Sequence, residues 1–167
     1  EDILGAYFFA GPKTGIELYW LPIALVAGMI DVRIEDLTVV VMAHELVHGY
    51  THLGRDIDGR TWETSGFRES EIEVIEGLAQ LYAQVVADRL SSRVPDARKA
   101  FDEFLKLQSG PYVVHKDWLK DNPPQRCETV RFAMLAARSR GKTTHDEWLA
   151  SLTDIAPRLG RSKAQRA

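Results

Sequence analysis

The sequence predicts an α+β fold in which a small N-terminal β-hairpin packs on a mostly helical domain. Two observations support this prediction. Residues 3–9 and 16–20 are rich in β-branched and aromatic side chains, and the turn-forming stretch AGPKTG lies between them. This pattern is typical of a hairpin whose loop is longer than two residues. Helical patterns fill most of the remaining chain, and Pro95, SGP at 109–111 and NPP at 122–124 separate them.

Six helices are expected after the hairpin. They cover residues 21–30, 35–53, 67–90, 96–108, 125–140 and 144–153. The first is almost entirely apolar and is expected to be buried. The second begins with Glu35 and Asp36, whose charges favour the positive N-terminal end of a helix. We expect a loop over residues 54–66, one domain over residues 1–155 and a flexible basic tail over residues 156–167.

Composition excludes several classes of protein. The chain has 21 Lys and Arg against 24 Asp and Glu, so its net charge of -3 offers no attraction for nucleic acid. The single cysteine, Cys127, excludes an internal disulfide and a cysteine-rich zinc site, and it suits the reducing cytoplasm. The longest apolar run, LYWLPIALVAGMI, is shorter than the roughly 20 residues that span a bilayer. We therefore expect a cytoplasmic protein, or a piece of one, without nucleic-acid or membrane partners.

The stretch HELVH, residues 44–48, carries the strongest chemical signal. On a helix, His44 and His48 lie one turn apart on one face, where two imidazoles can bind one Zn²⁺. Glu45 borders the open side of such a metal and can take a proton from metal-bound water. The motif therefore predicts a site for one zinc ion per chain. Two histidines and a carboxylate also suit iron, cobalt or manganese.

Three residues compete to be the third ligand. His52 lies about 12 Å along a straight helix from His44, so it reaches the same ion only if the helix breaks. Glu76 lies at the edge of the expected buried face of the next helix, whereas Glu73 and Gln80 lie in its solvated polar face. Glu76 is therefore the preferred ligand, and Glu73 and His52 are the alternatives.

The helix that contains Glu76 has two further expected features. Its buried face is expected to hold the residues that share one side at about 100° per residue, namely Ile72, Ile75, Ala79, Tyr82 and Val86. Gly77 lowers helix stability by about 1 kcal/mol relative to alanine. The close approach of another helix would explain a glycine at this position.

The motifs HELVH and EGLAQLY together resemble the gluzincin group of zinc metallopeptidases, over less than a third of the chain. That group carries HExxH on one helix and a glutamate ligand on the next. The resemblance implies a zincin-like domain in which His44, His48 and Glu76 bind zinc and Glu45 is the general base. It also implies that the second hairpin strand, near 16–20, lies beside the cleft and can pair with an extended peptide. The spacing HExxHxxxH also resembles the ImmA/IrrE group of regulatory proteases, which share the downstream glutamate.

The expected function is hydrolysis of peptide bonds in a peptide or protein substrate by a zinc metallopeptidase, either an endopeptidase or an aminopeptidase. Metal-activated water attacks the carbonyl carbon, and Glu45 accepts and passes on its proton. A further residue must help to stabilise the oxyanion, and PYVVH offers Tyr112 and His115 after a helix break. Two alternatives stay open. One is a non-catalytic zinc domain in which His52 closes a four-coordinate site, and the other is a domain that binds no metal.

Overall fold

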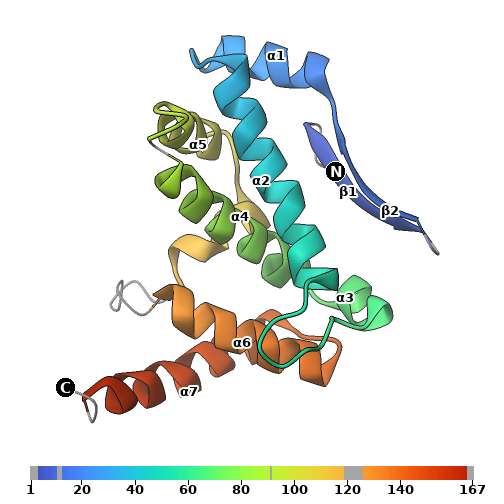
Figure 1. Cartoon of the computed structure of the whole chain (residues 1–167), viewed down its shortest axis with the longest axis vertical. Coiled ribbons are helices and arrows are strands. Elements are labelled where there is room, and N and C mark those ends of the chain that lie inside the picture. The colour runs from blue at the N-terminus through green and yellow to red at the C-terminus, as the bar shows by residue number, and fades with distance from the viewer. Residues whose placement is uncertain (1–3, 11–12, 91, 119–125, 165–167) are drawn as a thin grey trace.

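The structure is a computed structural model that describes residues 4–10, 13–90, 92–118 and 126–164. It confirms the predicted α+β class, because a two-stranded antiparallel hairpin precedes a mostly helical body (Figure 1). The hairpin consists of β1 (Gly5–Ala10) and β2 (Lys13–Leu18). The helices are α1 (Trp20–Met29), α2 (Ile34–Leu53), α3 (Thr64–Glu69), α4 (Ile72–Arg89), α5 (Ala97–Leu105), α6 (Arg126–Arg140) and α7 (His145–Ala164), with short 3-10 turns η1 (Gly110–Tyr112) and η2 (Val114–Lys116).

The hairpin extends into the stretch that the sequence assigned to its loop. The ladder runs from the pair Gly5–Leu18 to the pair Ala10–Lys13, so residues 13–15 are paired strand residues. The predicted long loop is therefore wrong. Gly15 pairs with Phe8 in this ladder, and a Cβ on Gly15 would lie 2.6 Å from the Phe8 ring, which explains why a glycine fits at this strand position.

Helices α1 and α2 form where the sequence predicted them, but α1 is not the buried helix that we expected. Only Ile23 and Ala27 of α1 are buried. Trp20 and Met29 are 74% and 76% exposed. The reason is position: α1 lies at one end of the molecule, where α2 covers only one of its sides (Figure 1).

The single helix predicted over residues 67–90 is divided into α3 and α4. Between them, the N–H of Glu71 donates to the carbonyl of Thr143, and Ser70 Oγ accepts from the N–H of Thr143. These bonds to a distant segment replace the helical bonds that would join α3 to α4. At the other end of the chain, α7 continues to Ala164 and so includes residues predicted as tail.

Helix α4 lies in the centre of the helical body (Figure 1). One core cluster packs it against α6 and α7 through Leu78, Leu81 and Trp148, and a second packs it against α5. Because α4 is covered on several sides, its predicted single buried face was wrong. Ile72 is 53% exposed, whereas Gln80, predicted to be solvated, is only 3% exposed. Within the described ranges, no helix has the length and apolar content needed to cross a membrane.

Gly77 is the site of a close approach, as predicted, but the neighbour is a side chain and not a helix. A Cβ on Gly77 would lie 2.4 Å from the indole of Trp118 and 2.9 Å from Val114. Trp118 is fully buried and lies two residues after the end of η2. The glycine therefore allows the segment after α5 to pack on α4 next to Glu76.

We expect Gly77→Ala to lower the free energy of unfolding by about 1–3 kcal/mol, because the added methyl overlaps the Trp118 indole in a filled core. The matched control is Gly28→Ala in α1, where a Cβ would meet nothing within 4 Å. The control is expected to gain up to about 1 kcal/mol from better helix propensity. Urea denaturation followed by circular dichroism measures both, and equal stabilities for the two variants would contradict the packing at Gly77.

Candidate metal centre

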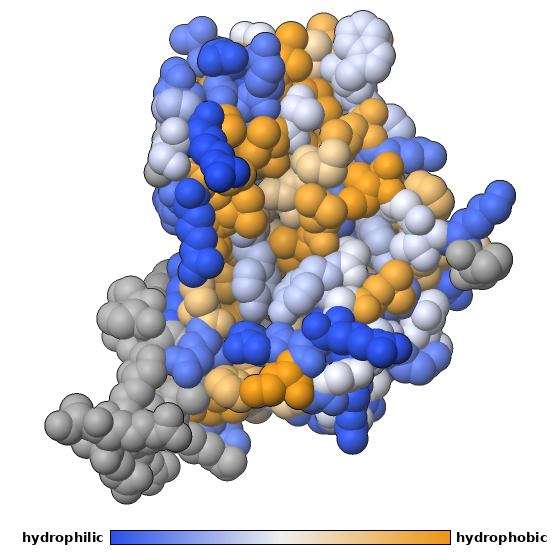
Figure 2. Space-filling view, viewed as in Figure 1, coloured by the Kyte–Doolittle hydropathy of each residue, from blue (hydrophilic) through white to orange (hydrophobic). Residues whose placement is uncertain are grey.

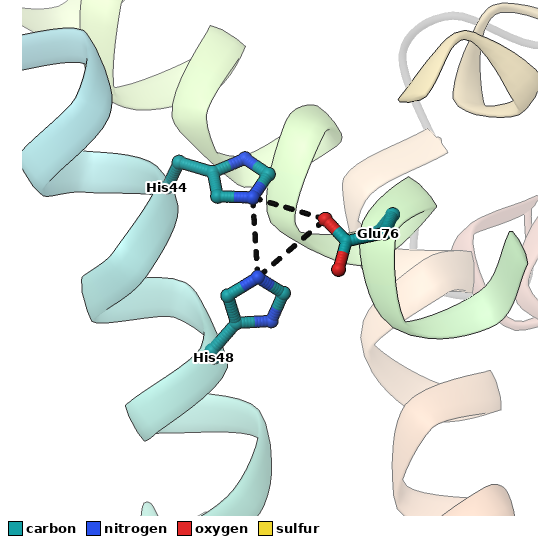
Figure 3. A group of neighbouring side chains, drawn as sticks. All are labelled: His44, His48 and Glu76. Carbon is teal, nitrogen blue, oxygen red and sulfur yellow. Dashed lines mark hydrogen bonds and ion pairs between the residues drawn. The ribbon is translucent and has the colours of Figure 1, made fainter. Parts of the chain in front are cut away.

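Three polar side chains converge in the interface between α2 and α4. His44 and His48 point from α2 toward α4, where the carboxylate of Glu76 faces them (Figure 3). The Nε2 atom of His44 lies 3.1 Å from Oε2 of Glu76 and 3.1 Å from Nε2 of His48. The Nε2 atom of His48 lies 3.6 Å from the same oxygen of Glu76. All three side chains are buried, so they form one compact group that can hold a metal ion.

The geometry of α2 explains why the two histidines point the same way. The helix runs without a break from Ile34 to Leu53, including Gly49. His44 and His48 are therefore one turn apart on one face. The apolar residues Val40 and Ala43 pack beside them against α4 and α5 and hold that side of α2 inward.

The spacing of the three atoms suits a tetrahedral metal ion. Zinc binds nitrogen and oxygen ligands at about 2.0–2.2 Å, so two ligands at a tetrahedral angle lie about 3.3 Å apart. The three measured separations, 3.1, 3.1 and 3.6 Å, lie around this value. The residues present therefore fit a zinc ion.

Hydrogen bonds alone satisfy this group poorly. A ring nitrogen of a neutral imidazole carries either a proton or a lone pair. Nε2 of His44 contacts both the Glu76 oxygen and Nε2 of His48, so it cannot donate to the first and accept from the second. A cation can accept a lone pair from each of the three atoms.

The carboxyl group of Glu76 is ionised in this environment. Although burial opposes ionisation, the hydrogen bonds from His44 and His48 outweigh it and lower the pKa of Glu76 to about 2, which favours the carboxylate.

Glu45 lies beside this group but is not part of it. Its side chain is fully buried between α2 and β1, and a Cβ on Gly5 would lie 3.1 Å from its Oε1. A larger residue at position 5 would therefore press on the Glu45 carboxylate. Glycine at this position lets the strand pass directly over Glu45.

Two cavities meet at Glu45 and Gly5, which line both of them. The first, of about 620 Å³, includes His44, and we call it the apolar cavity. The second, of about 650 Å³, includes His48 and Glu76, and we call it the strand cavity because much of β1 lines it. The candidate metal centre therefore lies between two hollows.

The hairpin lies beside these cavities, but mainly through its first strand. Gly5, Ala6, Tyr7 and Phe9 line the strand cavity, whereas only Tyr19 does so from the predicted stretch 16–20. The resemblance implied that the second strand would lie there. The first strand does so because Gly5 and Tyr7 pack on α2, which leaves β2 on the outer side of β1 (Figure 1).

His52, one of the alternative ligands, lies outside the group of three. Its Nδ1 forms a 2.9 Å hydrogen bond with the Tyr7 hydroxyl, and its Nε2 forms a 3.0 Å bond with Thr64 Oγ1. Its ring stacks on Phe67 at 4.7 Å. Burial, helped by the charge of Arg68, lowers the pKa of His52 and favours the neutral ring. The structure therefore joins His52 to β1 and α3.

The structure brings only one of the remaining candidates to the site. Glu73, half-buried one turn before Glu76, is not among the three converging residues. Tyr112 lines the apolar cavity, and its ring centroid lies 6.3 Å from that of His44. His115 is fully buried near Phe101 and lines neither cavity. Burial, together with the charge of Arg126, lowers the pKa of His115 to about 4.

Sequence reasoning did not identify Gly5, Tyr7 or Gln80 as residues of the site. Gln80 carried a usable signal, because it follows Glu76 by four residues and so lies on the same face of α4. Gly5 and Tyr7 carried none, because their role depends on how the hairpin packs on α2.

Comparison of the chain with family models, curated proteins and solved structures gives no match. The likeness to gluzincins therefore rests on the two motifs and on the geometry of His44, His48 and Glu76.

We expect Glu76→Ala to weaken zinc binding by more than about 100-fold, because changes to residues that merely support ligands already weaken it about 10–100-fold. Glu73→Ala is the matched control, since it removes a carboxylate from the same helix outside the group. Titration calorimetry with zinc measures both variants. Unchanged affinity in Glu76→Ala, or equal losses in both variants, would contradict the assigned ligand set.

We expect Tyr7→Phe to lower the free energy of unfolding by about 1–3 kcal/mol, because it leaves Nδ1 of the buried His52 without its partner. Zinc stoichiometry should stay at one per chain. Tyr19→Phe, which removes an exposed bond to Glu17, is the control and should change stability by no more than about 0.5 kcal/mol. Loss of zinc in Tyr7→Phe would mean that His52 contributes to the metal site.

Proposed function

We propose that this protein is a zinc-dependent peptidase with a zincin-like fold. One observation carries the proposal: His44, His48 and Glu76 converge at the spacing of zinc ligands, and the buried Glu45 lies next to them between two cavities. Two histidines and a glutamate are the protein ligands of several catalytic zinc sites, which keep one coordination position open.

His44, His48 and Glu76 would hold the metal. When bound, a zinc ion supplies a Lewis acid that polarises a carbonyl group and lowers the pKa of water toward neutrality. The same donors also suit iron, cobalt or manganese. We propose zinc because two histidines and a glutamate are the protein ligands of several catalytic zinc sites.

Glu45 is the general base in this proposal. Its carboxylate takes a proton from the attacking water and delivers it to the amine that leaves. Burial between α2 and β1 keeps the carboxylate in one place and strengthens its electrostatic interactions with the reacting atoms. Gly5 contributes by leaving room for the Glu45 side chain.

Tyr112 is the residue that we assign to the carbonyl oxygen of the substrate. It lines the same cavity as His44 and Glu45, and its ring lies next to that of His44. A phenol hydroxyl there can donate a hydrogen bond as negative charge develops on the oxygen. His115, the other candidate, is packed away from both cavities.

The strand β1 provides a place for the substrate backbone. It pairs with β2 along one edge, and the sheet in the described part of the chain has only these two strands. In this proposal, an extended peptide adds to the other edge of β1 as a further strand. Because β1 lines the strand cavity, such a peptide would pass the candidate metal centre.

The rival function, a closed structural zinc site, needs His52 as a fourth ligand. Both ring nitrogens of His52 already have partners, Tyr7 and Thr64. The geometry therefore favours the peptidase over the structural site.

We expect Glu45→Gln to lower the rate of peptide hydrolysis by at least about 100-fold, because the amide cannot accept the proton. Zinc should remain at one per chain, since Glu45 is outside the ligand group. Glu73→Gln, the control, should retain both zinc and activity. Cleavage of a peptide library, followed by mass spectrometry, measures the rates. A Glu45→Gln variant that holds zinc and cleaves at the wild-type rate would refute the proposed function.

A further inference from the structure

We propose that the protein is an endopeptidase that cuts within apolar segments, and that the apolar cavity receives a large uncharged side chain next to the scissile bond. This inference rests on the proposed function and names its class of substrate.

The two cavities support cleavage within a chain. Glu45, the proposed base, lines both of them, so the bond that reacts beside Glu45 has a hollow on each side. His44 lines one hollow, and His48 and Glu76 line the other. A bound polypeptide can therefore continue in both directions from the reacting bond, as the substrate of an endopeptidase does.

The lining of the apolar cavity selects the side chain. Much of its wall is apolar, including Leu4, Val26, Met29, Val40, Val41 and Phe104. These residues belong to the start of the hairpin, α1, α2 and α5. Burial of apolar surface against such walls is favourable in proportion to its area. The cavity therefore favours aliphatic and aromatic side chains.

Charged side chains would bind poorly in the same cavity. Besides Tyr112, the ionisable residues in its lining are His44 and Glu45. In the proposed function these two residues bind the metal and the attacking water, so they do not pair with a substrate side chain. Its other polar side chains are neutral: Ser109 and the amides of Gln80 and Gln108, which are joined by a 2.7 Å hydrogen bond from Gln80 Nε2 to Gln108 Oε1. A charged group would thus lose its hydration without gaining an oppositely charged partner.

The volume of the apolar cavity suits a large side chain. A buried apolar cavity of about 150 Å³ can hold a benzene ring. The apolar cavity, at about 620 Å³, therefore has room for any natural side chain together with part of the backbone. Small residues would leave most of it unfilled, so we expect leucine, methionine and phenylalanine to be preferred over alanine and glycine.

Leu107 offers a way to change this preference without touching the centre. It lines the apolar cavity and is 55% exposed, so a polar residue is tolerated there. Leu107→Asp places a negative charge on the cavity wall, which should weaken the binding of apolar side chains and attract basic ones. Ile57→Asp is the matched control, because Ile57 is 80% exposed and lies outside both cavities.

The test uses zinc-loaded protein and peptides whose termini are acetylated and amidated, with one position varied at a time around a fixed central sequence. Wild type should cut these peptides internally, with leucine or phenylalanine favoured over aspartate on one side of the cut. In Leu107→Asp, the ratio of kcat/KM for lysine over leucine at that position should rise about 10-fold. Ile57→Asp should behave as wild type.

Three results would overturn the inference. The first is that the blocked peptides stay intact while the same peptides with free termini lose single terminal residues. The other two are an unchanged preference in Leu107→Asp and an equal change in Ile57→Asp. A binding measurement separates this inference from the proposed function. Fluorescence anisotropy with labelled blocked peptides and zinc-loaded Glu45→Gln should show tighter binding of leucine than of aspartate peptides. If that preference appears but wild type cleaves no peptide, the cavity assignment stands and the peptidase proposal fails.

Discussion

The packing of α2 against α4 is the constraint on which the candidate site depends. It brings two imidazoles and a carboxylate into contact in a buried interface, where unpaired polar groups are unfavourable. Packing elsewhere fixes both helices. The guanidinium of Arg138, from α6, donates hydrogen bonds to the carbonyls of Tyr50 and Thr51 in the last turn of α2. These bonds tie the C-terminal end of α2 to α6. Trp118 packs on Gly77 of α4, directly beside Glu76, and so holds this part of α4 in place.

The hairpin borders this centre on one side. Tyr7 hydrogen-bonds His52, and its ring lies 6.3 Å from that of His48, while Phe9 packs on the His52 ring at 4.7 Å. These contacts hold β1 along α2, so that Gly5 covers Glu45 and the two cavities form on either side. Figure 2 shows, on the face seen in Figure 1, broad apolar areas broken by polar residues. His52 thus supports the strand that borders the centre, a different role from that of a ligand.

Local patterns in the sequence predicted most of the elements and the three converging residues. In HELVH the two histidines are four residues apart, about one helical turn, so a helix places them on the same side. Glu76 was predicted at the edge of a buried face, and its carboxylate does face the two histidines of α2. Burial was predicted less well, because it depends on neighbours distant in sequence. Gln80 was predicted to face solvent but is buried, because α4 is covered on several sides. Helix α1 was predicted to be buried, but among the described residues nothing packs on its outer side. The hairpin packs on α2 through residues about 40 positions apart in the sequence, such as Gly5 and Glu45. A pattern within one short segment cannot predict such a contact.

A crystal structure of the zinc-loaded protein, with anomalous data collected at the zinc edge, tests the central claim most directly. We expect one ion within about 2.2 Å of His44 Nε2, His48 Nε2 and a Glu76 carboxylate oxygen. We also expect one coordination position without a protein atom, facing Glu45. No anomalous peak between α2 and α4, or an ion closed off by a fourth protein ligand, would contradict the account.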